Sequence, residues 1–296
     1  MPRSQPARVR AAIHPPPFRF LSWHRARDRP SGTATPLPRY VSRTSRAQTE
    51  TEPSRRKNKL ARPPPSLTLL PPHVNAVPEF SWGPPEPDDG LGLVALDYQL
   101  SADRLVSAYR HGIFPWPDGS PLNPIPWVCP PHRAILEFDR LHVPHNLRRA
   151  RRALSHLTFT TDRAFETVIH ACAAAPRPGQ AGTWITPAMI GAYVELHRRG
   201  LAHSVEAWDG AALVGGLYGV TAADVFTGES MFHRLSDVSK LCVLHLVDHL
   251  RDRGATWIDI QQLTPHFALL GAHEITRAEF LRRLNAEQQA PRPLFG

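Results

Sequence analysis

Cysteine is scarce, with 3 in 296 residues, and methionine is equally rare. Cys129, Cys172 and Cys242 lie far apart, so they form neither a Cys-x-x-Cys pair nor an even set for a disulfide framework. The sequence also lacks any apolar run of the 18 or so residues that a membrane helix requires. These absences argue against a secreted, disulfide-stapled scaffold and against a membrane partner, and we expect a cytoplasmic protein.

Acidic residues are scarce in the first 75 positions, which hold 15 Lys and Arg against 3 Asp and Glu, or +12. The remaining residues hold 20 against 23, or −3, so the net charge of +9 arises in this segment and is no evidence that the rest binds nucleic acid. Rich in proline and arginine and without periodicity, residues 1–75 are predicted to be a disordered basic tail. A start codon assigned too early, a transit peptide and an RNA contact remain open alternatives.

The rest of the chain mixes helical and strand patterns, which predicts an α+β fold. Ser101 is expected to cap a helix over 102–111, in which Leu105, Val106 and Tyr109 form an apolar stripe. A Pro-Gly segment at 176–182 is typical of a connection between domains. We therefore predict a small α/β N-terminal domain over 76–175 and a catalytic domain over 176–296. In the latter we expect helices at 187–199, 237–253 and 276–284, and strands at 202–208, 212–219, 223–227 and 256–260.

Three polar side chains in this second domain are candidates for chemistry. Glu229 follows an apolar strand, where a buried carboxylate is costly unless it is paired. Asp259 and Gln261 stand two apart on a short strand, so they point to the same face and can act on one ligand. A polar network that only stabilises the fold is the alternative.

Two familiar motifs are incomplete. His245 and His249 have zinc-protease spacing, but Leu246 stands where the motif requires glutamate, so we expect no metal site. Gly228 and Ser230 match the first glycine and the serine of a serine-hydrolase elbow, but Phe232 replaces its second glycine.

Several blocks together carry a resemblance to a known family. They read Gly-Glu-Ser-Met-Phe at 228–232, Ser-Lys at 239–240 and Ile-Asp-Ile-Gln at 258–261, with further matches at 108–116, 183–185, 202–206 and 213–219. The chain resembles leucyl/phenylalanyl-tRNA-protein transferases over roughly residues 90 to 285. The resemblance implies a GNAT-like acyltransferase fold for the second domain. No cofactor is expected, because residues 233–236 lack the glycines that would let a coenzyme A pyrophosphate approach.

The resemblance further implies transfer of leucine or phenylalanine, and less readily methionine, from charged tRNA. The acceptor would be the α-amine of a protein beginning with Arg or Lys, which is thereby marked for degradation. We expect Asp259 to draw the amine proton or orient the ammonium, and Gln261 to hydrogen-bond the reacting carbonyl region. Glu229 is expected to hold Gln261 and to add a negative field that favours a basic N-terminal residue. Replacing Asp259 or Gln261 with alanine should slow transfer at least about tenfold and leave the fold intact.

The remaining site expectations concern the charged tRNA. Trp116, Trp184 and Tyr193 match aromatic positions around the aminoacyl-adenosine end, and Met231 and Phe232 are expected to line a side-chain pocket. A helical run of arginines is either a tRNA contact or a solvated face; its members are Arg148, Arg149, Arg151 and Arg152. Two alternatives remain: a related transferase with another aminoacyl-tRNA or acceptor, and a non-catalytic tRNA-binding protein.

Overall fold

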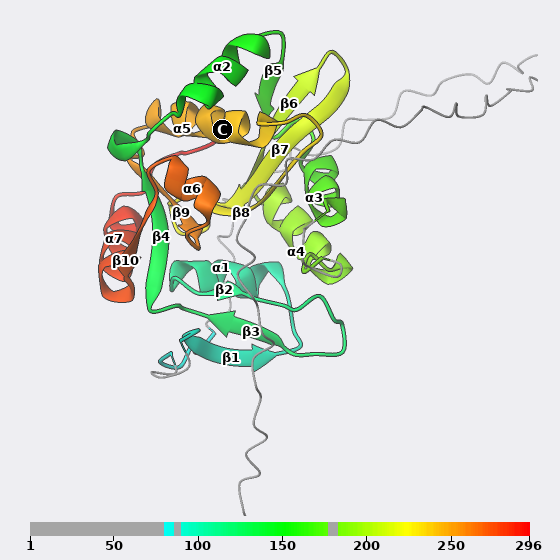
Figure 1. Ribbon diagram of the computed structural model, residues 1–296. Helices are drawn as coiled ribbons and strands as arrows, with labels where there is room; N and C mark the ends of the chain where they lie inside the picture. The colour runs from blue at the N-terminus through cyan, green and yellow to red at the C-terminus, as the bar shows by residue number, and fades with distance from the viewer. Residues whose placement is uncertain (1–79, 86–89, 177–182) are drawn as a thin grey trace, which may run out of the picture. The chain divides into compact units, whose positions relative to one another are not determined.

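The computed structural model describes residues 80–85, 90–176 and 183–296 (Figure 1). The chain divides into two units, of which Val74–Gly296 contains all the described residues. The tail predicted over 1–75 lies outside them, as does the 176–182 connection except for Pro176. Among the described residues, no helix has the length and apolar character needed to cross a bilayer.

A small antiparallel sheet and one helix begin the described part. Its strands β1 (Leu93–Asp97), β2 (Phe114–Pro115) and β3 (Ile125–Val128) lie in the order β1-β3-β2. Helix α1 (Ala102–Arg110) confirms the predicted helix, and Ser101 caps it by accepting from the backbone N–H of Arg104 at 3.2 Å. Because Gly112 adopts φ of +73°, the chain turns sharply after α1 and enters β2.

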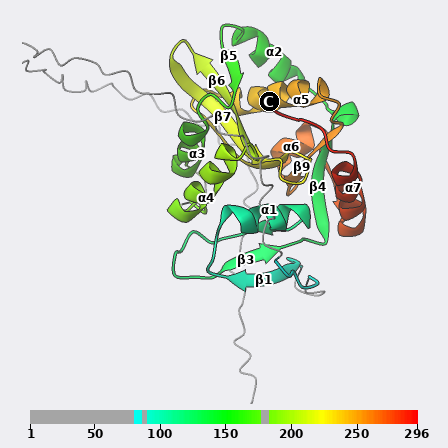
Figure 2. The same ribbon diagram turned by 180° about the vertical axis from the view of Figure 1, so that it is seen from behind.

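A seven-stranded sheet in the order β10-β4-β9-β8-β7-β6-β5 forms the centre of the unit (Figures 1 and 2). Every neighbouring pair is antiparallel except β8 and β9, which are parallel and pair at Thr227 and Asp259. The strands are β4 (His132–Glu137), β5 (Thr158–Thr161), β6 (Ala202–Asp209), β7 (Ala212–Val220), β8 (Thr227–His233), β9 (Trp257–Gln261) and β10 (His273–Thr276).

Two hydrophobic cores cover the two faces of this sheet. One contains side chains of α1, α3 (Phe165–Ala174) and α4 (Pro187–Arg198). The other contains side chains of α2 (His145–Ala153) and α5 (Val238–Arg251). The short helices η1 (Phe138–Arg140) and α6 (Pro265–Leu269) and the longer α7 (Arg277–Gln289) complete the unit.

The structure confirms a mixed α+β fold, while the division into domains at residue 176 stays a prediction. The strand predicted at 223–227 was misplaced, because β8 begins at Thr227 and continues to His233. The polar residues Glu229 and Ser230 suggested that the strand had ended before them. They instead lie within β8, which pairs with β7, and Ser230 lies opposite Tyr218. Gly219 permits this pairing, because a Cβ there would lie 2.4 Å from the carbonyl oxygen of Thr227. β8 can therefore approach β7 closely two residues before Glu229.

Candidate active site

Glu229 on β8 is the centre of a polar cluster drawn from four elements. Its Oε1 accepts hydrogen bonds from the Tyr109 hydroxyl on α1 and from Nε2 of Gln261 on β9, both at 2.6 Å. Its Oε2 accepts from the Tyr193 hydroxyl on α4 at 3.0 Å. A carboxylate oxygen has two acceptor positions, so Oε1 is saturated and Oε2 retains one position. Glu229 is only partly buried, whereas both tyrosines are buried.

The two tyrosine hydroxyls also contact each other at 2.7 Å, so Tyr109, Tyr193 and Glu229 share three close oxygen contacts. Each such contact needs one proton. Two hydroxyls supply two protons when Glu229 is ionised, which leaves one contact without a proton. Uptake of a proton by Glu229 supplies the third. The geometry therefore favours a carboxyl group that readily takes up a proton.

Burial raises the pKa of Glu229 from its ordinary 4.5 to about 7. The hydrogen bonds from Tyr109 and Tyr193 oppose this increase, the Asp259 charge adds to it, and the Arg133 charge opposes it. Burial, followed by the Glu229 charge, raises the pKa of both tyrosines well above the ordinary value, which keeps their hydroxyls protonated as donors. Glu229 can thus change protonation state near neutral pH.

Asp259 has a different environment, a buried ion pair with Arg133 of β4. Arg133 donates from Nε to Oδ1 at 2.8 Å and from Nη2 to Oδ2 at 2.7 Å. Oδ1 also accepts from the backbone N–H of Gln261 at 2.9 Å, and Oδ2 from the Thr227 hydroxyl at 3.1 Å. The four acceptor positions of the carboxylate are all occupied, and Asp259 is 0% exposed. This carboxylate has no free acceptor position for a substrate proton, which argues against the proton-accepting role predicted for Asp259.

The backbone of Gln261 is in the left-handed region, with φ of +62°. A non-glycine residue in this region is under strain, and such strain persists only where the surroundings hold it. The Asp259 carboxylate provides one restraint by binding the Gln261 N–H. This backbone conformation orients the Gln261 side chain toward Glu229.

The other predicted substrate contacts are more dispersed. Trp116 and Trp184 are partly exposed beside the core that includes α1 and α4. Tyr193 is 0% exposed, so its ring is closed to stacking by a base. Met231 and Phe232 pack into different cores on opposite faces of the sheet, because successive strand residues alternate in direction. They therefore do not line one pocket.

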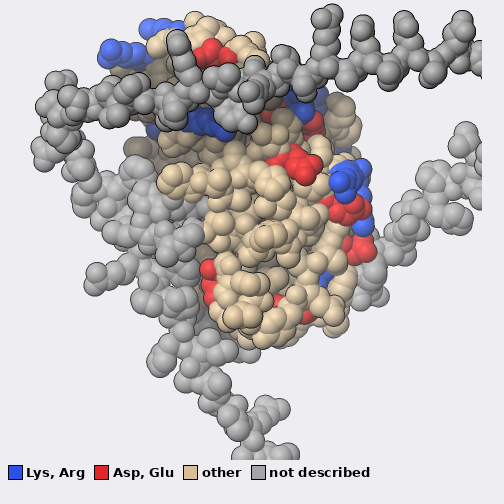
Figure 3. All heavy atoms as spheres, turned by 90° about the vertical axis from the view of Figure 1, so that its right-hand side faces the viewer, with Lys and Arg blue, Asp and Glu red and all other residues tan. Residues whose placement is uncertain are grey.

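The four arginines of the predicted tRNA contact are exposed on α2, which is anchored by buried Leu147. Arg151 lies 3.8 Å from Asp248, and the other three form no ion pair among the described residues. Figure 3 shows basic side chains gathered at the upper end of the molecule, and α2 lies at this end in Figures 1 and 2, away from α1.

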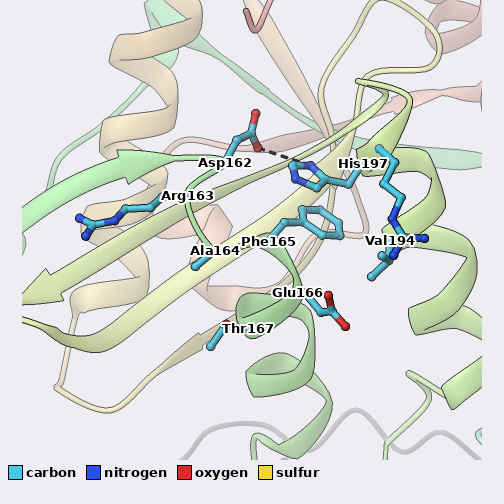
Figure 4. Close-up of a pocket in the computed structure, with 9 residues that line it drawn as sticks. Asp162, Arg163, Ala164, Phe165, Glu166, Thr167, Val194 and His197 are labelled. Atoms are coloured by element: carbon cyan, nitrogen blue, oxygen red, sulfur yellow. Dashed lines mark ion pairs between the residues drawn. The ribbon is translucent and has the colours of Figure 1, made fainter. Parts of the chain in front are cut away.

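A separate pocket of about 250 Å³ lies beside α3 and α4 (Figure 4). Residues 162–167, Val194, His197 and Arg198 line it, and none of them belongs to the Glu229 cluster. The His197 ring stacks on Phe165 with their centroids 4.3 Å apart. Among the described residues, no group of three or more His, Cys, Asp or Glu side chains is placed to hold a metal ion.

Three residues of the cluster were not among the site residues predicted from the sequence: Tyr109, Arg133 and Thr227. Tyr109 was expected only as part of the helix over 102–111 and of the matching block 108–116, although its hydroxyl makes the polar contact. Arg133 stands just before an apolar stretch of β4, and a lone cation in such a position is the signal that indicates a buried partner. Nothing in the sequence indicated Thr227.

Comparison with known proteins gives consistent matches. A family model described as leucyl/phenylalanyl-tRNA protein transferase matches residues 135–285, and one for the N-terminal domain of the same family matches residues 98–131. A leucyl/phenylalanyl-tRNA–protein transferase of Oleidesulfovibrio alaskensis is 47% identical over 225 residues, covering 74% of this chain and 90% of the relative. One of Anaeromyxobacter dehalogenans is 48% identical over 206 residues, covering 70% and 86%.

A solved structure, the C-terminal domain of a putative lysylphosphatidylglycerol synthetase from Agrobacterium fabrum, matches with a TM-score of 0.31 and 14% identity. The match covers 67% of this chain and 62% of that one. A TM-score this low assigns no fold.

Proposed function

The chain belongs to the leucyl/phenylalanyl-tRNA–protein transferase family, and from this membership we propose that it transfers leucine or phenylalanine, and less readily methionine, from charged tRNA. The proposed acceptor is the α-amine of proteins that begin with Arg or Lys, in the cytoplasm, and the product is marked for degradation. The identity of 47% over 74% of the chain and 90% of a relative is the observation that carries this proposal. For the sheet that contains the parallel β8–β9 pair we propose a GNAT-like fold without a cofactor.

In the proposed reaction, Glu229 accepts the proton of the attacking amine. A protein α-ammonium has a pKa near 8, so a carboxylate with a pKa of about 7 is a well-matched acceptor at neutral pH. The vacant acceptor position on Oε2 is where the ammonium would bind. The amine then attacks the ester carbonyl, the C–N bond forms, and the ester C–O bond breaks to release the tRNA 3′ oxygen. That oxygen leaves with the proton that the attacking nitrogen releases as the amide forms, and no covalent enzyme intermediate is needed.

We propose that Gln261 orients the same amine. Since its Nε2 donates to Glu229, the amide oxygen points away from that carboxylate and can accept an N–H of the amine. Asp259 exchanges no proton in this scheme. Trp116 and Trp184 remain the proposed contacts of the terminal adenosine, where stacking on a base is worth roughly 1 to 3 kcal/mol.

The α2 arginines are proposed to bind tRNA phosphates. Replacing Arg148, Arg149 and Arg152 with alanine should weaken binding of charged tRNA. The negative slope of log K against log salt should become shallower by about 0.7 to 0.9 per lost contact. Fluorescence titration from low to physiological salt measures both quantities. Arg282→Ala is the matched control, because Arg282 is an exposed helical arginine on α7 that is paired with Glu279. An unchanged slope in the triple variant would assign α2 to a solvated face.

The decisive test is a transfer assay with the purified full-length chain. tRNAs charged with leucine, phenylalanine, methionine or valine are offered with peptides that begin with Arg, Lys, Asp or Glu. We expect leucine and phenylalanine to be transferred to the Arg and Lys peptides, and valine to be disfavoured. Transfer only to Asp or Glu peptides would identify a related enzyme with another acceptor. Binding of charged tRNA without transfer to any peptide would identify a tRNA-binding protein.

A further inference from the structure

Arg133 is a buried cation that the proposed chemistry does not use. Its side chain is 2% exposed, so it cannot reach a substrate. The guanidinium lies between the rings of Phe114 and Phe280, with its carbon 4.4 and 4.5 Å from their centroids. It forms a two-point contact with Asp259, and Nη1 donates to the carbonyl oxygen of Gly112 at 3.2 Å.

These contacts join two segments that each supply a hydrogen bond to Glu229. On one side, Arg133 fixes the Asp259 carboxylate, which in turn binds the backbone N–H of Gln261. On the other, it binds Gly112, which ends the turn that follows Tyr109. Gln261 and Tyr109 are the two donors to Oε1 of Glu229.

We propose that Arg133 is a positioning residue, which sets Gln261 and Tyr109 against Glu229 for the transfer reaction. The inference rests on the proposed function. The shape of the guanidinium matters, because a planar fork can hold both Asp259 oxygens and the Gly112 carbonyl together. Lysine carries the same charge on a single nitrogen and cannot reproduce the two parallel bonds. Stability alone is a weak explanation, since well-packed apolar residues often replace buried ion pairs at no cost.

Arg133→Lys tests the geometry separately from the charge. We expect kcat for leucine transfer to fall at least about tenfold, because a misplacement of about 1 Å in a catalytic group is enough for such a loss. The KM values for charged tRNA and for an Arg-initiated peptide should change by less than about threefold, because Arg133 contacts neither substrate. Loss of the Tyr109 hydrogen bond would also raise the pKa of Glu229, so the rising limb of the pH–rate profile should move to higher pH.

Arg104→Lys is the matched control. Arg104 likewise stacks on aromatic rings, those of Phe80, Trp82 and Trp127, and pairs with Asp97 at 2.6 Å, but it contacts no member of the Glu229 cluster. This variant should retain wild-type kcat and an unshifted pH profile. The full-length chain is used throughout.

A second variant decides the question if Arg133→Lys does not fold. The double replacement Arg133→Met with Asp259→Leu removes both charges, so the fold should survive, while kcat falls as in Arg133→Lys because the Gln261 N–H has lost its acceptor. Wild-type kcat in either folded variant would overturn the positioning role and leave the proposed function intact. Absence of transfer by the wild-type chain would overturn both.

Discussion

Glutamine in place of Glu229 is expected to lower kcat/KM for leucine transfer by about a hundredfold or more, which is the usual contribution of a positioned general base. Glutamine has nearly the same shape and can still contact Tyr193 and Gln261, but it cannot take up a proton at neutral pH. Steady-state transfer from leucyl-tRNA to an Arg-initiated peptide measures the loss. Circular dichroism spectra and the melting temperature of the variant, compared with wild type, control for folding.

The pH dependence of kcat/KM identifies the group whose replacement lowers the rate of transfer. In the wild-type chain two groups should limit kcat/KM on the acid side, Glu229 with a pKa of about 7 and the acceptor amine with one near 8. In Glu229→Gln only the amine limb should remain. Retention of a limb near pH 7 in that variant would show that another residue accepts the proton.

The same group links stability to pH. Because folding raises the pKa of Glu229 from 4.5 to about 7, the folded state binds a proton that the unfolded state has released over this range. Its contribution to stability is fully present below pH 4.5 and is lost as the pH rises to about 7. A rise in pKa from 4.5 to about 7 corresponds to at most about 3 to 4 kcal/mol. Glutamine does not titrate, so the Glu229→Gln variant should lose this pH dependence of stability. The substitution should therefore stabilise the fold near neutral pH while it disables the reaction.

Local patterns in the sequence were sufficient for much of the architecture. Capping by Ser101 and the apolar stripe after it predicted α1, and the alternation around Asp259 placed that residue and Gln261 on one strand, β9. These features depend on neighbours within a few positions. The contact of Gln261 with Glu229 is different, because the two residues stand 32 positions apart and the contact was expected from the family resemblance.

The errors arose where the decisive partner is distant in sequence or where a local rule was overlooked. Arg133, which stands 126 positions away, fills two of the four acceptor positions of Asp259, and no local pattern specifies that pairing. The left-handed backbone of Gln261 likewise depends on a tertiary restraint. Met231 and Phe232 are different, because strand periodicity by itself sends adjacent side chains to opposite faces. A single pocket lined by both side chains was therefore inconsistent with strand alternation, which the sequence alone could have shown.

Asp259→Ala is expected to cost about 3 to 5 kcal/mol of folding free energy, because it leaves the Arg133 guanidinium buried without its partner. This expectation replaces the one drawn from the sequence, that the fold would remain intact. Urea unfolding at pH 7 measures the change as a lower midpoint. Transfer by this variant would fall for two reasons, loss of folded protein and loss of the Gln261 restraint, so its activity alone says little about chemistry.

Gln261 variants separate those two effects. Gln261→Ala removes the amide without disturbing the Arg133–Asp259 pair, so the urea midpoint should stay near that of wild type while kcat falls at least about tenfold. Gln261→Gly removes the same amide but suits φ of +62°, so it should be more stable than Gln261→Ala by about 1 kcal/mol and equally slow. Equal rates with different stabilities would assign the rate loss to the missing amide. If Gln261→Gly instead restored transfer, the strained backbone rather than the amide would be the feature that limits the reaction.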